Sequence, residues 1–304
     1  MNKFFRNIVG SIASIGYLIN TVFWVIPIVI FSFLKLIPIR PWQTAISHLL
    51  DGCATSWINV NTVNQKLTHS TQLEVSGIET LTLRDWYLVI SNHQSWVDIL
   101  ILQRVLNGKI PFLKFFLKKE LIWVPFLGIA WWALDFPFMH RHSKSFLAKN
   151  PHLKGKDLKN TQKACEKFRF KPVSVMNFVE GTRFTEQKHN RQGEVFTHLL
   201  KPKAGGMAFV LSAMGSQLHK LVDVTIYYPH GIPSYWDFVC GRVDSIQIKV
   251  NILSIEELLN SESFGDDYFD NPAQRVKFQK WLNQLWSEKD ALLKQMSADQ
   301  KQDV

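Results

Sequence analysis

The sequence predicts an α/β domain, with a mixed, largely parallel central sheet flanked by helices, behind an N-terminal membrane-associated helical segment. Three observations predict this fold class. Strand-like apolar runs alternate with helical patterns after residue 70, an uncharged stretch opens the chain, and two polar motifs directly follow strand-like runs. With 304 residues and 46% hydrophobic content, the chain can form one large core and an appendage. We expect a helical anchor over 1–70, an α/β domain over 71–296 and a polar tail over 297–304.

The first element is an uncharged stretch over residues 7–34, flanked by Lys3 and Arg6 on one side and by Lys35 and Arg40 on the other. It exceeds the roughly 20 apolar residues that cross a bilayer core. A signal peptide fits less well, because the stretch is too long and no small-residue cleavage site closes it. We predict a membrane anchor. Two cations at each end leave open whether it spans or re-enters the membrane.

The second element, over residues 41–70, alternates apolar and polar side chains at helical spacing. Such a helix lies on the membrane or packs back on the first one. The alternative is that it covers the soluble core.

The α/β domain follows as seven strand-like runs and four helical patterns. Only the tail after Lys294 reads as disordered. The strand-like runs are 72–76, 86–91, 109–113, 133–139, 172–179, 221–228 and 245–252. The helical patterns are 96–106, 160–169, 204–218 and 272–295.

Two further segments allow more than one interpretation. The uncharged run over 121–134 is too short to span a bilayer, and is either a core helix or the wall of a pocket for a fatty chain. Residues 141–171 carry ten Lys or Arg against two acids. A solvated face is the ordinary interpretation of such a run. Contact with anionic headgroups, or docking of an acidic carrier, are the alternatives.

The amino-acid composition indicates which kinds of partner the chain binds. The chain has 11 Trp, 22 Phe and a net charge of +10, which suits a membrane interface where rings enter the acyl boundary and cations meet headgroups. It lacks an arginine-rich face or reader motif, so we expect membrane lipids and no nucleic acid as partners. Cys53, Cys165 and Cys240 are far apart and form no CxxC, which predicts a reducing compartment and no structural zinc.

The first polar motif is Asn92-His93-Gln94-Ser95-Trp96-Val97-Asp98, between a strand-like run and a helical pattern. On a continuous helix, His93 and Asp98 would point about 140° apart, so they meet only if the chain turns between them. Asp98 can then accept from one ring nitrogen and leave the other as a base that deprotonates a hydroxyl attacking an activated carbonyl. An ordinary surface pair is the alternative, because H-x4-D alone is a weak motif.

The second motif, residues 177–184, also ends a strand-like run. Gly181 permits a sharp turn, and Arg183 offers a bidentate fork that suits a phosphate. A strand-end turn with a surface Arg is the alternative.

Four blocks together resemble the 1-acylglycerol-3-phosphate O-acyltransferases and their glycerolipid acyltransferase relatives. The blocks are NHQSWVDIL at 92–100, FPFMHR at 136–141, FVEGTRF at 178–184 and KPKAGG at 201–206. The resemblance covers about residues 72–230, and is closest to the subgroup that includes lysophospholipid and lysocardiolipin acyltransferases. It departs at Phe184, where many members have a small polar residue, and in lacking a proline block near 222–224.

The resemblance implies a role for nine residues. His93 would be the general base and Asp98 its orienting partner. The residues that would bind the substrate are Glu180, Gly181, Thr182 and Arg183 in the acceptor block, with Arg141, Lys114 and Lys203 as further cations near the phosphate.

The implied reaction moves a fatty acyl group from acyl-CoA or acyl-ACP to the free hydroxyl of lysophosphatidate, giving phosphatidate, with no metal and no bound cofactor. We expect the enzyme in the inner (cytoplasmic) membrane, with its active site facing the cytosol. Another lysophospholipid or a lipid A-type acceptor is the first alternative. A metal-dependent lipid hydrolase with His93 and Asp98 as ligands is the second.

Overall fold

A computed structural model describes residues 2–124, 127–139, 156–193, 195–265 and 267–302. Its main sheet has six strands in the order β1-β8-β7-β2-β6-β3. Neighbouring strands are parallel except for the antiparallel pair β7 and β8, so the predicted mixed, largely parallel sheet is confirmed. The strands are β1 (Gln72–Ser76), β2 (Tyr87–Ser91), β3 (Leu113–Phe115), β6 (Ser174–Asn177), β7 (Lys220–Tyr227) and β8 (Ser245–Ser254), with β4 (Leu117–Lys118) and β5 (Phe138–Met139) paired separately.

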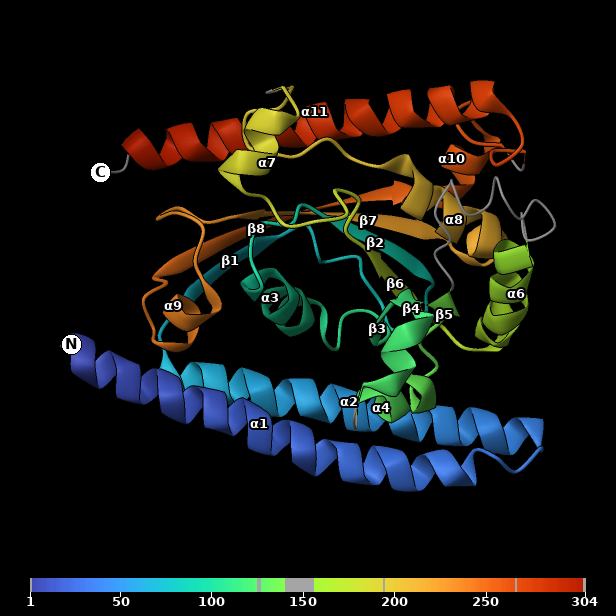
Figure 1. Cartoon of the computed structure of the whole chain (residues 1–304), viewed down its shortest axis with the longest axis horizontal. Helices are drawn as coiled ribbons and strands as arrows, with labels where there is room; N and C mark the ends of the chain where they lie inside the picture. Colours follow the sequence, from blue (N-terminus) through green and yellow to red (C-terminus); the bar gives the residue numbers. More distant parts are fainter. Residues whose placement is uncertain (1, 125–126, 140–155, 194, 266, 303–304) are drawn as a thin grey trace.

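Helices cover both faces of this sheet. Figure 1 shows α11 above the sheet, α3 and α9 below it, and the α1–α2 pair as the lowest layer. The α-helices are α1 (Lys3–Leu34), α2 (Arg40–Thr68), α3 (Val97–Leu106), α4 (Leu127–Ala133), α6 (Lys156–Cys165), α7 (Glu186–Arg191), α8 (Ala204–Met214), α9 (Tyr235–Val239), α10 (Ile255–Asn260) and α11 (Pro272–Gln302). Short 3-10 helices are η1 (Lys119–Trp123), η3 (Glu166–Phe170) and η4 (Gly215–Gln217).

Strand β2 shows why the sheet forms at its centre. All five of its residues are buried, as expected for a parallel strand covered on both faces. Leu88 and Ile90 join the apolar cluster beneath α8 and α11, whereas Tyr87 and Val89 join the cluster beside α3. The strand therefore fixes the position of the polar turn that follows it.

Helices α1 and α2 run side by side along the lower edge of the molecule (Figure 1). The side-chain amide of Asn20 on α1 donates to Asn61 Oδ1 of α2 at 2.7 Å and to the Trp57 carbonyl at 2.9 Å. Among the described residues, α1 is the one helix long and apolar enough to cross a membrane. Helix α2 packs back on α1, as one interpretation had it, and its other side meets α3 through a hydrogen bond from Arg104 to Gln65.

Several predicted boundaries are wrong. The strand expected over 109–113 lies at Leu113–Phe115, and the one expected over 133–139 is reduced to Phe138–Met139 because α4 occupies the apolar run before it. Periodicity alone does not separate a short buried strand from a buried helix. The tail expected to be disordered after Lys294 continues α11 to Gln302.

The run over 121–134 forms part of η1 and all of α4. Ala130, Ala133 and Leu134 are buried in an apolar cluster with α1 and α2, which favours the core-helix interpretation. Its other face carries exposed Trp132, which lies outside that cluster.

Candidate active site

The turn after β2 is anchored by Asn92, which is fully buried. Its side chain accepts from Ile226 N and donates to Ile226 O, both at 2.9 Å, so the amide forms a two-bond clamp onto strand β7. Ser91 Oγ donates to the Asn92 carbonyl at 3.0 Å. The backbone hydrogen bonds between β2 and β7 end where β2 turns away. Because buried backbone groups need partners, the Asn92 side chain bonds the N–H and C=O of Ile226 in their place.

The turn brings His93 and Asp98 together, as predicted. His93 Nδ1 lies 2.9 Å from Asp98 Oδ2. Asp98 is buried in the first turn of α3, where a helix N-terminus favours negative charge. The His93 side chain is 12% exposed, and within the described part of the chain its Nε2 makes no hydrogen bond. One ring nitrogen is thus oriented by a carboxylate, and the other is available to a substrate.

The second motif packs directly on the first. The Phe178 ring stacks on the His93 imidazole, with centroids 3.9 Å apart and planes at 15°. Phe184 N donates to the His93 carbonyl at 2.7 Å, which fixes the two motifs to each other. Phe178 was not predicted as a site residue, although it is the first residue of the FVEGTRF block.

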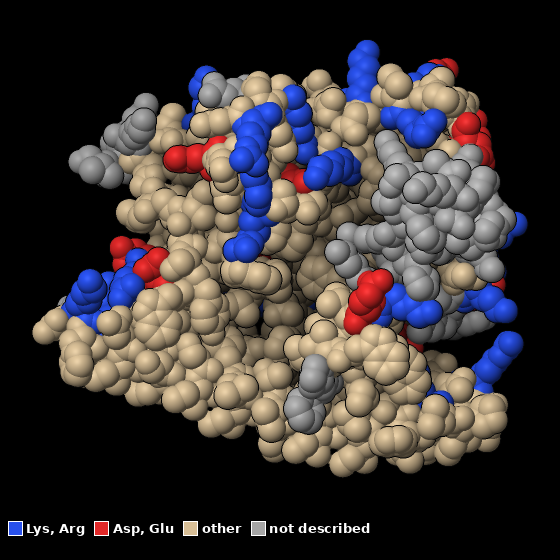
Figure 2. Space-filling model, viewed as in Figure 1, with Lys and Arg blue, Asp and Glu red and all other residues tan. Residues whose placement is uncertain are grey.

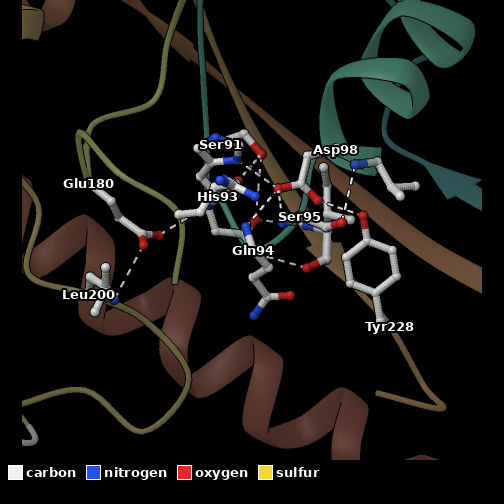
Figure 3. A network of polar contacts seen from close by, with 12 residues as sticks. Ser91, His93, Gln94, Ser95, Asp98, Glu180, Leu200 and Tyr228 are labelled. Atoms are coloured by element: carbon white, nitrogen blue, oxygen red, sulfur yellow. Dashed lines mark hydrogen bonds and ion pairs between the residues drawn. The ribbon is translucent and has the colours of Figure 1, made fainter. Parts of the chain in front are cut away.

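Glu180 faces the His93 turn from the inside. Its carboxylate oxygens accept from His93 N at 3.3 Å and from Leu200 N at 3.4 Å, as Figure 3 shows. Complete burial raises the pKa of Glu180 from 4.5 to about 8, and the nearby charge of Asp98 adds to this rise. At neutral pH Glu180 is therefore mostly neutral.

The rest of the acceptor block lies at the surface. Gly181 has φ +71°, which disfavours any residue with a side chain. A Cβ added there would meet the exposed Lys203 side chain at 3.5 Å, so Lys203 lies beside the turn. Lys188 on α7 donates to Thr182 Oγ1 at 2.8 Å and to the Arg183 carbonyl at 2.9 Å. This lysine fixes the loop from outside.

Arg183 is exposed and its guanidinium lies over the Trp96 ring, 4.5 Å from the centroid. Trp96 ends the turn that carries His93, so the guanidinium is held close to His93. In Figure 2, Lys and Arg side chains gather over α7 above a hollow, whereas the layer formed by α1 and α2 is mainly uncharged on this face. The site thus has cations on one side and apolar helices on the other.

Comparison with known proteins gives the family. The family model described as Acyltransferase matches residues 72–229, more than half of the chain. The chain belongs to the acyltransferase family. The resemblance found in the sequence is thereby confirmed, and the matched region contains both motifs.

Two similar curated proteins are named as acyltransferases of a 1-acyl-glycerol phosphate and of lysocardiolipin. The chain is 25% identical over 227 residues to 1-acyl-sn-glycerol-3-phosphate acyltransferase delta of Bos taurus, covering 69% of this chain and 53% of that protein. It is 22% identical over 300 residues to lysocardiolipin acyltransferase 1 of Mus musculus, covering 94% and 72%. The chain spans about half the length of the first of these relatives.

A solved structure shares the architecture of this chain. The 1-acyl-sn-glycerophosphate acyltransferase PlsC of Thermotoga maritima superposes with a TM-score of 0.51 at 16% identity, covering 95% of this chain and 98% of the other. At this identity the likeness concerns the architecture alone.

Of the remaining predicted cations, Lys114 lies away from Arg183 and Lys203, and Arg141 cannot be placed among the described residues. Lys114 is 2% exposed, and its ammonium donates to Asp51 Oδ1 at 3.0 Å and to the Leu134 carbonyl at 2.6 Å. Its ion pair with α2 argues against a role for Lys114 as a phosphate ligand. Arg141 lies outside the described residues, as does much of the basic run over 141–171.

Two residues near the site were not predicted. Tyr228, just after β7, donates its hydroxyl to Asp98 Oδ1 at 2.5 Å. Lys289 on α11 is buried and lies 2.7 Å from Asp223 of β7. No local pattern could have found either, because each partner lies more than 60 positions away in the sequence.

Proposed function

We propose that this chain transfers a fatty acyl group from acyl-CoA or acyl-ACP to the free hydroxyl of lysophosphatidate, giving phosphatidate. The observation that carries the proposal is the pair His93–Asp98, with Nδ1 bonded at 2.9 Å and Nε2 available, beside a stacked and exposed Arg183. A base and a phosphate-binding cation side by side are what an acceptor with both a hydroxyl and a phosphate requires.

In the proposed reaction, His93 Nε2 removes the proton of the acceptor hydroxyl. The hydroxyl oxygen bonds to the thioester carbonyl carbon, the carbon–sulfur bond breaks, and the proton held on Nε2 passes to the departing thiolate. Asp98 fixes the ring tautomer and stabilises the imidazolium that forms between these steps. A thioester is activated already, so a positioned and deprotonated alcohol needs no nucleophile on the enzyme.

The acceptor phosphate would bind Arg183 and Lys203. Stacking on Trp96 holds the guanidinium plane and leaves its N–H edges for phosphate oxygens. Lys203, at the N-terminus of α8, lies beside Gly181 and adds a second cation from a different segment. In this proposal the backbone of the block formed by Glu180, Gly181 and Thr182 borders the glycerol, while the Glu180 carboxyl supports the His93 turn from inside.

We further propose that the enzyme binds the inner membrane from its cytosolic side. Helix α1 presents a row of exposed apolar side chains, and the chain carries a net charge of +10 that attracts anionic lipids. The proposed acceptor lysophosphatidate and the product phosphatidate are lipids of such a membrane. The exposed large apolar residues of α1 are Phe4, Phe5, Ile8, Ile12, Ile15, Leu18, Ile19, Val22, Phe23, Ile26, Ile30, Phe33 and Leu34.

A different lysophospholipid is the second candidate acceptor, and the similarity to a lysocardiolipin acyltransferase favours it over a lipid A-type acceptor. A metal-dependent hydrolase is disfavoured by the bonding of Asp98. Four donors already occupy its two oxygens, so the carboxylate is not free to ligate a cation.

The test is transfer of a labelled acyl group to lysophosphatidate by detergent-solubilised His93→Ala, assayed with acyl-CoA and acyl-ACP. We expect a loss of about 10²–10⁴-fold, the usual contribution of a general base. The matched control is His219→Ala, because His219 also pairs with an aspartate, Asp85 at 2.7 Å, but is 57% exposed. His219→Ala should keep its activity and both variants should bind vesicles. Full activity of His93→Ala would rule out the proposed base.

A further inference from the structure

Tyr228 follows the last residue of β7 and is 4% exposed. Its hydroxyl points at Asp98, with 2.5 Å between Tyr228 Oη and Asp98 Oδ1 (Figure 3). Burial, together with the neighbouring charge of Asp98, raises the pKa of Tyr228 well above its usual range. The hydroxyl therefore keeps its proton and acts as a donor to the carboxylate.

The donors to Asp98 are divided unequally between its two oxygens. Oδ2 is bonded by His93 Nδ1 at 2.9 Å, Gln94 N at 2.6 Å and Ser95 N at 2.9 Å. Tyr228 is the sole donor to Oδ1 among the residues that the structure describes. Without this hydroxyl, a fully buried carboxylate oxygen would lose its partner, which leaves its charge less well stabilised.

We propose that Tyr228 is a positioning residue of the acyl-transfer site, whose hydroxyl holds Asp98 Oδ1 and limits the negative charge that Asp98 presents to His93. This inference rests on the proposed function, because it assumes that His93 acts as the base. A carboxylate that shares its charge with a donor attracts the Nδ1 proton less strongly. The imidazolium is then less favoured, so the neutral ring that takes the proton of the acceptor hydroxyl persists to a lower pH.

The other charged groups around the pair do not depend on the tyrosine hydroxyl. Glu180 faces the His93 amide, and Lys289 lies behind it, bonded to Asp223 on β7. Replacing Tyr228 by Phe removes one oxygen and leaves these groups in place. On the side of the pair, Glu180 accepts from the His93 amide and Arg183 lies over Trp96, and His230, Asp237 and Arg242 line a cavity beside Tyr228. Asp223 bonds Lys289 on α11, which covers the sheet face opposite α3.

The experiment is the pH profile of kcat and KM for Tyr228→Phe with lysophosphatidate and the acyl donor. We expect the acid limb of the kcat profile to move to higher pH by about 0.5–1 unit, which lowers kcat about 3–10-fold on that limb. The difference should shrink as the pH rises, and KM for lysophosphatidate should not change. A purely structural defect would instead lower activity by one factor at every pH.

The matched control is Tyr227→Phe. Its hydroxyl contacts Gln300 of α11 at 3.0 Å, on the opposite face of the sheet from Asp98. Its profile should match that of the unaltered enzyme. In an Asp98→Asn background, adding Tyr228→Phe should leave the profile unchanged.

A second variant tests the same idea with the opposite sign. Fluorotyrosine at position 228 keeps the ring and is a stronger hydrogen-bond donor, so the acid limb should move to lower pH. An unshifted profile for either variant, or an equal shift for Tyr227→Phe, would overturn the role of Tyr228. Absence of transfer to lysophosphatidate by the unaltered enzyme would instead refute the proposed function, so the two failures are distinguishable.

Discussion

Glu180 should make the stability of this protein depend on pH. Its carboxyl is fully buried, and burial raises its pKa from 4.5 to about 8. The folded state thus binds this proton more tightly than the unfolded state. Below pH 4.5 Glu180 is protonated in both the folded and the unfolded state, so it does not change the free energy of unfolding. Between pH 4.5 and 8 the unfolded chain loses this proton first, so the free energy of unfolding falls steadily. Above pH 8 the fall is complete.

The perturbation is Glu180→Gln, which keeps the shape and cannot ionise. Relative to the unaltered protein, its free energy of unfolding should rise by about 1.4 kcal/mol per pH unit between these two values. At pH 7 the relative gain is then about 3 kcal/mol compared with pH 4.5. The glutamine NH2 group also faces a backbone donor, either His93 N or Leu200 N. This lowers the free energy of unfolding by the same amount at every pH and leaves the slope unchanged.

The assay is denaturant unfolding in detergent, followed by tryptophan fluorescence at pH 5, 6, 7 and 8. Glu79→Gln is the matched control, because Glu79 is exposed and should give a constant difference. Parallel stability curves for the unaltered protein and Glu180→Gln would refute the reasoning, since they would show that Glu180 ionises as easily in the fold as in the unfolded chain.

Two more predictions concern cations. Arg183→Ala should raise KM for lysophosphatidate about 10-fold or more, as loss of a charged hydrogen bond implies, while KM for the acyl donor is unchanged. Arg191→Ala on α7 is the control, and equal effects on both substrates would remove Arg183 from the phosphate site. Lys289→Met should lower stability by about 3–5 kcal/mol, because it leaves the buried Asp223 carboxylate unpaired. The exposed Lys294→Met should cost little, and Asp223→Asn combined with Lys289→Met should recover part of the loss; thermal melts in detergent compare all three.

Burial of Lys289 connects the C-terminal helix to the family domain. Its ammonium bonds Asp223, the Val224 carbonyl and Thr225 Oγ1, at 2.7–2.8 Å. Helix α11 lies outside the residues matched by the family model, yet it completes the sheet face opposite α3. The helix therefore packs on the same sheet that carries the two motifs.

The sequence by itself determined the elements that local chemistry specifies. The continuous apolar run of β2 predicts a strand buried on both faces, and the uncharged run over 7–34 predicts the long apolar helix α1. The pairing of His93 with Asp98 also followed from the sequence, because the predicted turn between a strand and a helix lets residues five apart meet, whereas a continuous helix would separate them. These features depend on neighbours within a few residues.

Only the tertiary structure decided which distant groups surround that pair. Strand β2 lies between β7 and β6, and this order brings Tyr228 and Glu180 to Asp98 and His93 across separations of 130 and 87 residues. The same fold directs Lys114 toward Asp51 of α2, whereas it was expected to be a cation near the acceptor phosphate. Sheet order depends on which apolar faces pack together over the whole chain. The local hydrophobic periodicity does not contain this information, so the groups around His93 and Asp98 depend on the tertiary fold.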